Sequence, residues 1–128
     1  MAVSQPAKIQ SLDEIYAMIR AAVTAKRPIA AVYEGRYRLL CPHRLGWNKK
    51  GQPGVLCYQY GGESRSGLNA EGSPENWRCM DVELLRWVEL LEEPWRTAPN
   101  RSRPQSCVAR VDADAEDHQP DREPQNGQ

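Results

Sequence analysis

The chain begins with the pattern of one amphipathic helix and changes, after Pro28, to short strand-like segments. Apolar side chains recur at helical spacing between Leu12 and Val23, and Ser11 and Glu14 have the spacing of a capping box. Pro28 is expected to end the helix, because proline lacks the backbone N–H that a helix needs. One helix followed only by short strands limits the fold to a small sheet covered by that helix.

The segments after the helix are rich in β-branched and aromatic residues and are separated by glycine or proline. We expect strands at 29–33, 37–40, 55–60 and 77–80, with a hairpin at 34–36 and with Pro42 ending the second strand. Residues 81–91 fit a helical face and a strand equally well, so both interpretations stay open.

Strands this short need closure or cover, because an open sheet exposes its edges. We therefore expect a mainly β (α+β) fold, in which the N-terminal helix packs across one end of a small, strongly curved β-barrel of about five strands. The domain should span about residues 8–96. Residues 97–128 are rich in proline and polar side chains, and we expect them to form a disordered, acidic tail.

The whole chain is formally neutral, but its charges are unevenly distributed. Residues 111–128 contain six acidic side chains and one arginine, a net charge of −5, so residues 1–110 carry +5. A basic body can bind anions, and an acidic tail can compete for the same surface. A tail that serves only solubility is the alternative.

Several classes of protein are not expected. There is no apolar run of the roughly 20 residues that a membrane helix needs, and residues 1–11 lack a secretion signal, so a cytoplasmic location is predicted.

The four cysteines form no C-x-x-C pair, and Cys41 and His43 lack further ligands nearby in sequence, so no metal or cofactor is predicted. Cys57 and Cys79 are expected to be small buried side chains within strands. No carboxylate pair suggests acid–base catalysis, so we do not expect an enzyme.

Basic residues supply the candidate binding site. Arg36 and Arg38 alternate with Tyr37, which places both arginines on one face of a strand. Guanidinium groups bind phosphate oxygens in pairs, and tyrosines can stack on bases. The candidate ligand-binding residues are Arg36, Arg38, His43, Tyr58, Tyr60, Arg65 and Arg78.

Residues 29–43, Ile-Ala-Ala-Val-Tyr-Glu-Gly-Arg-Tyr-Arg-Leu-Leu-Cys-Pro-His, resemble the opening of a WYL domain, and the resemblance continues to about residue 95 through the Gly51 turn and the segment 77–80. It implies an Sm-like (SH3-type) β-barrel in a stand-alone bacterial relative that senses a ligand, often a nucleotide or nucleic acid. Gly54-Val55-Leu56 stands where the family has Trp-Tyr-Leu, so only the leucine is shared.

Two functions follow as hypotheses. The first is non-catalytic binding of a nucleotide or single-stranded nucleic acid, with a regulatory or sensing role. The alternative is a protein–protein interaction or homodimer, because the strand edges of such a barrel readily pair with another chain.

Overall fold

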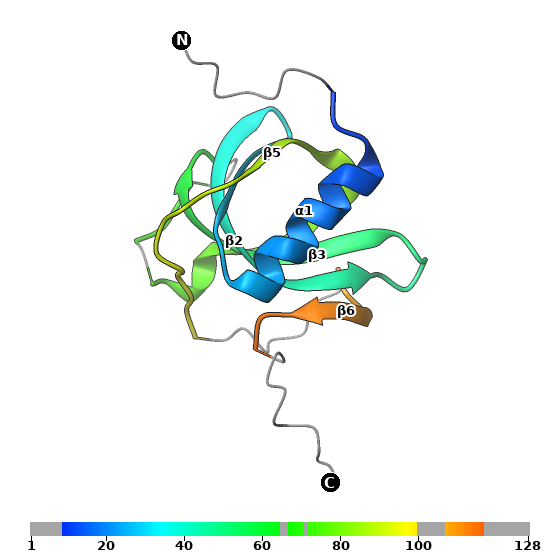
Figure 1. Cartoon of the computed structure of the whole chain (residues 1–128). Coiled ribbons are helices and arrows are strands. Elements are labelled where there is room, and N and C mark those ends of the chain that lie inside the picture. Colours follow the sequence, from blue (N-terminus) through cyan, green and yellow to red (C-terminus); the bar gives the residue numbers. More distant parts are fainter. Residues whose placement is uncertain (1–8, 65–66, 71, 100–106, 117–128) are drawn as a thin grey trace, which may run out of the picture.

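The computed structural model describes residues 9–64, 67–70, 72–99 and 107–116 (Figure 1). The helix α1 spans Leu12–Ala25, as predicted. Its capping box is formed, because the Glu14 N–H donates to Ser11 Oγ at 3.1 Å and the Ser11 N–H donates to Glu14 Oε1 at 2.8 Å. Lys26 ends the helix in the left-handed conformation, two residues before Pro28.

Six antiparallel strands follow the helix in the described part of the chain. They are β1 (Ile29–Tyr33), β2 (Arg36–Trp47), β3 (Pro53–Gly62), β4 (Trp77–Asp81), β5 (Leu85–Leu90) and β6 (Arg110–Asp114). The short 3₁₀ turns η1 (Pro74–Asn76) and η2 (Val82–Leu84) precede β4 and β5. The ambiguous segment 81–91 therefore forms a 3₁₀ turn and a strand, and the mainly β class with one N-terminal helix is confirmed.

The prediction that Pro42 ends the second strand is wrong. β2 continues to Trp47, with Pro42 at an irregularity in the pairing with β3. On its other side, β2 pairs with β1 as far as Leu40 and with β6 from Arg44 onward. Pro42 thus lies between the two partners, where its missing N–H disrupts neither of these ladders.

The prediction of a closed barrel is also wrong, because the sheet is open. Its order is β4-β3-β2-β1-β5, and the two end strands β4 and β5 are not paired in the part of the chain that is described. At this opening the backbone N–H of Asp81 donates to the Tyr33 hydroxyl at 3.1 Å. A side chain of β1 thus contacts β4 where a closed barrel would have strand pairing.

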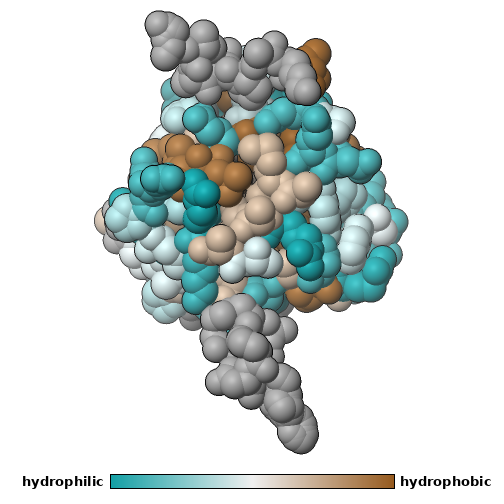
Figure 2. Space-filling view, viewed as in Figure 1, coloured by the Kyte–Doolittle hydropathy of each residue, from teal (hydrophilic) through white to brown (hydrophobic). Residues whose placement is uncertain are grey.

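The core lies between α1 and the concave face of the curved sheet (Figure 1). Ile15, Ile19 and Val23 of the helix are buried in one cluster with side chains from β1 to β5. Apolar and polar surface alternate on the face that carries α1 (Figure 2). Among the described helices, none is long and apolar enough to cross a membrane.

The prediction that residues 97–128 lack structure is wrong for the segment 107–116. β6 pairs with residues 44–47 of β2, and Ala113 and Ala115 are buried. Cys79 is exposed and forms a disulfide with Cys107, so the expectation of a buried free thiol is wrong as well. The predicted disorder of residues 117–128 falls outside the described residues.

Two glycines make room for this C-terminal segment. Gly46 and Gly54 are paired across β2 and β3, and a Cβ at either would collide with the carbonyl oxygen of Arg110 or Cys107. The acidic side chains of β6 are also held: Asp112 accepts from the Tyr16 hydroxyl at 2.7 Å, and Asp114 pairs with Arg44 at 2.8 Å. These two carboxylates therefore contact α1 and the far end of β2.

Candidate anion-binding site

Arg38 is the most unusual of the predicted site residues, because its charged side chain is almost completely buried. The residue is 3% exposed, and its guanidinium lies 5.3 Å from the centre of the Tyr33 ring. Nη2 donates to the Tyr33 carbonyl oxygen at 3.3 Å and to Glu34 Oε1 at 3.5 Å, and Nη1 donates to Gln59 Oε1 at 3.4 Å. These are long bonds for a charged donor, and Nε is buried without a partner among the described residues.

The turn between β1 and β2 and the end of β3 set this position. Glu34 and Gly35 both have positive φ, as a two-residue hairpin requires, and the turn brings the Glu34 carboxylate to Arg38. Gly62 pairs with Arg38, and a Cβ there would collide with the carbonyl oxygen of Tyr37. The glycine therefore lets β3 approach β2 closely at the arginine.

Gln59 connects Arg38 to the loop that follows β3. It is fully buried, and its amide nitrogen donates to the carbonyl oxygens of Gly61 at 3.0 Å and Glu63 at 2.8 Å. Its other amide atom, Oε1, accepts from Arg38. Gln59 therefore fixes both the guanidinium and the start of the loop.

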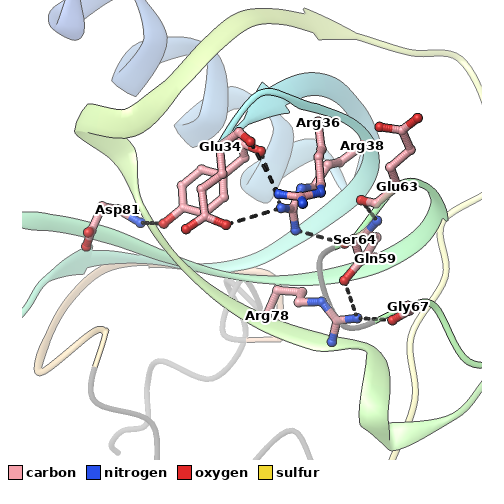
Figure 3. Close-up of polar contacts among 10 residues, drawn as sticks. Glu34, Arg36, Arg38, Gln59, Glu63, Ser64, Gly67, Arg78 and Asp81 are labelled. Carbon is pink, nitrogen blue, oxygen red and sulfur yellow. Dashed lines mark hydrogen bonds and ion pairs between the residues drawn. The ribbon is translucent and has the colours of Figure 1, made fainter.

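Arg78 reaches the same place from β4 (Figure 3). Its Nη1 donates to the Glu75 carbonyl oxygen at 2.7 Å, and its Nη2 donates to Ser64 Oγ at 3.3 Å and to the Gly67 carbonyl oxygen at 3.2 Å. Burial and the nearby charge of Arg38 lower the pKa of Arg78. The pKa of Arg38 is lowered chiefly by burial and also by Arg36, while Glu34 opposes the shift.

The two arginines line one hollow of about 170 Å³, together with Tyr33, Glu34, Ser64, Cys79 and Met80. A water molecule takes about 30 Å³ of liquid volume, so the space suits a group the size of phosphate and is too small for a whole nucleotide. Two guanidinium groups and one carboxylate leave this hollow with a net positive charge.

Arg36 lies near this pair on the same face of β2, as predicted (Figure 3). Its side chain is partly exposed, and Nη1 donates to the Glu34 carbonyl oxygen at 3.5 Å. Arg36 therefore adds positive charge beside the hollow. Arg65, also predicted, lies outside the described residues.

His43, Tyr58 and Tyr60 belong to other parts of the fold. His43 is 1% exposed and packs between the rings of Trp77 and Trp95, with centroid distances of 4.8 and 4.6 Å. It is a core residue because β2 continues past Pro42 and carries it into the sheet.

Both predicted tyrosines also make contacts within the fold. Tyr58 is fully buried, and its hydroxyl donates to the Ser73 carbonyl oxygen and accepts from the Gly72 N–H. The Tyr60 hydroxyl donates to Glu93 at 2.7 Å, and Arg96 covers its ring at 4.0 Å. Tyr58 is therefore not available for stacking on a base, which corrects that expectation, and Tyr60 already has a cation on its ring.

Comparison with known proteins adds nothing to this geometry. No family model, curated protein or solved structure matches this chain.

The four cysteines are either joined in a disulfide or buried. No group of three His, Cys, Asp or Glu side chains suited to a metal ion occurs within the described part of the chain. Cys41 and Cys57 are buried, and burial raises the pKa of the Cys57 thiol. A thiol with a raised pKa stays protonated and is a poor nucleophile.

Sequence reasoning did not foresee that Gln59, Ser64 and the Gly61-Gly62 pair position the arginines. The glycine pair was visible at the end of a strand-like segment and could have indicated a close backbone approach. The burial of Gln59 had no such signal, because it depends on the pairing of β2 with β3.

Proposed function

We propose that this chain is a non-catalytic binding protein for a phosphate-bearing ligand, a nucleotide or a single-stranded nucleic acid, held at the Arg38–Arg78 hollow. The observation that carries the proposal is the buried guanidinium of Arg38, whose Nε lacks a partner beside a second guanidinium. Burying a charge costs free energy unless it is well paired, and the ion pair of Arg38 with Glu34 is long, at 3.5 Å, so a bound anion would add a closer partner. One phosphate group would balance the net positive charge of the hollow.

The size of the hollow defines how the ligand is recognised. A phosphate group would occupy the hollow, and the nucleoside would lie outside it, along the surface near Arg36. With Tyr58 buried, the phosphate contacts would supply most of the affinity, so little discrimination among bases is expected.

The resemblance to WYL domains also supports a role in sensing such a ligand. One helix followed by five consecutive antiparallel strands, curved around that helix, agrees with the Sm-like architecture that the resemblance implies. We infer that the fold is a variant of this architecture in which the barrel stays open between β4 and β5.

The Cys79–Cys107 disulfide bears on the cellular location. Disulfides persist in oxidising compartments and are rare in the cytosol, where thiols are kept reduced. The disulfide therefore favours an oxidising environment over the predicted cytoplasmic one.

Salt dependence of binding tests the proposal. Labelled single-stranded DNA or RNA, followed by fluorescence anisotropy, should bind the full-length protein and weaken about three- to sevenfold between 50 and 200 mM salt if one or two phosphates are contacted. At either salt concentration, Arg36→Met should bind more weakly than the parent protein. Its binding should also depend less on salt, because Arg36 lies beside the hollow and is partly exposed.

Lys49→Met is the matched control, because it also removes one exposed positive charge, in the turn between β2 and β3. It should bind as the parent protein does. Equal losses in both variants would indicate unspecific attraction to a basic surface and would contradict the proposal.

The alternative function, pairing of a strand edge with another chain, meets an obstacle at β5. The side-chain amide of Gln10 pairs with the backbone of Val88, accepting from its N–H and donating to its carbonyl oxygen, both at 2.9 Å. Gln10 thus occupies the bonds that an incoming strand would use.

Gln10→Ala should therefore expose this edge. We expect it to lower the free energy of unfolding by about 1–3 kcal/mol and to increase self-association at high concentration, measured by analytical ultracentrifugation. A variant that stays monomeric and equally stable would show that Gln10 does not protect the edge.

A further inference from the structure

A second hollow, of about 580 Å³, lies on the other side of the β1–β2 hairpin from the two arginines. It is lined by Ala30, Val32, Gly35, Tyr37, Glu63, Trp87 and Glu89. Tyr37 alternates with Arg36 and Arg38 along β2, so its side chain leaves the strand on the opposite face. The volume lies in the range of sites for small molecules.

Trp87 reaches this hollow through an irregular backbone. The pairing of β1 with β5 shifts between Ala30 and Val32, and Trp87 at this shift has a φ of 53°. A bulky side chain rarely adopts this left-handed conformation, and bulges of this kind redirect side chains. Trp87 is 44% exposed, and strain of this kind is typical of functional positions.

The other side chains of the hollow define the charge of its ligand. Tyr37 is 54% exposed, so two aromatic rings are open to the space. Glu63 and Glu89 are exposed, and neither forms an ion pair within the described residues. Among the residues that the structure describes, no lysine or arginine lines this hollow; Arg86 lines the adjoining one, where its Nη1 donates to the carbonyl oxygens of Glu83 and Leu85.

We propose that this hollow binds an organic cation, a methylated ammonium group, between Tyr37 and Trp87. The faces of aromatic rings attract such cations, and the two carboxylates supply the countercharge. The occupant differs from the anion at Arg38 in charge and in position, so the inference stands independently of the phosphate site.

An NMR titration with the free amino acid Nε-trimethyllysine tests this inference. We expect saturable shifts of the Trp87 indole N–H, assigned by comparison with Trp87→Phe, and of the Tyr37 amide. The analogue that carries a neutral tert-butyl group in place of trimethylammonium should bind at least about fivefold more weakly, because it lacks the charge. Equal affinity of the two compounds, or no saturable shift with the cation, would overturn the proposal.

Variants separate binding from folding. Trp87→Gly should keep the native spectrum, because glycine adopts positive φ freely, and should abolish binding. The double variant Glu63→Gln/Glu89→Gln should also weaken binding, while Glu83→Gln, an exposed glutamate outside the hollow, should leave it unchanged. Native-like affinity in the double variant would overturn the role of the carboxylates and with it the proposal.

Discussion

The double variant Cys79→Ser/Cys107→Ser is expected to lower the free energy of unfolding by about 3–4 kcal/mol. The disulfide joins β4 to the segment before β6 across 28 residues of sequence, and a cross-link of this span restricts the unfolded chain by about that amount. Denaturant unfolding of the oxidised parent and the variant measures the difference. Reduction of the parent protein should reproduce the variant's stability.

The same variant should loosen β6 before the rest of the fold. The backbone N–H groups of Ala109 and Ala115 donate to the carbonyl oxygens of Trp47 and His43, at 2.7 and 2.8 Å. Both amides should exchange with solvent faster without the disulfide, while amides of β3 stay protected. Unchanged stability together with unchanged exchange would show that the disulfide does not hold the segment in place.

Arg38→Met is expected to separate binding from stability. The substitution removes a buried charge beside the charge of Arg78, and this gain should offset the loss of its long hydrogen bonds to Tyr33 and Gln59, so the melting temperature should stay level. Affinity for single-stranded DNA should fall about 10- to 100-fold, because a charge-assisted hydrogen bond contributes about 1.5–3 kcal/mol. Thermal unfolding and fluorescence anisotropy on the same preparation measure both quantities.

The opposite result would identify Arg38 as a structural residue. In that case Arg38→Met would lose stability, because the Tyr33 carbonyl oxygen and Gln59 would be left without their donor. Binding per folded molecule would then be unchanged. The Lys49→Met variant serves as the control for the loss of one charge in both measurements.

Local patterns in the sequence were enough to predict the helix and part of the arginine cluster. The capping box at Ser11 and the stop at Pro28 depend on neighbours in sequence, so the helix could be predicted closely. Arg36 and Arg38 share a face because alternation along a strand is also local. Arg78 joins them only through the pairing of β3 with β4, and the sequence alone could not show it.

Long-range contacts account for what was missed. β6 has few apolar side chains and is held by the disulfide and by Asp112 and Asp114, so a composition argument placed it in a disordered tail. Closure of the barrel depends on how β4 and β5 end, which no local pattern encodes. His43 and Tyr58 were predicted as ligand-binding residues because the length of β2 and the burial of β3 were not foreseen.

The most direct test of the anion site is the Nε–H signal of Arg38 in the NMR spectrum during titration with adenosine monophosphate. This proton lies on the buried nitrogen that lacks a partner among the described residues. Phosphate binding at the hollow predicts a saturable, salt-sensitive shift of this signal together with that of Arg78 and the amide of Ser64. An unchanged Arg38 signal up to millimolar ligand, or shifts confined to exposed lysines, would contradict binding at this site.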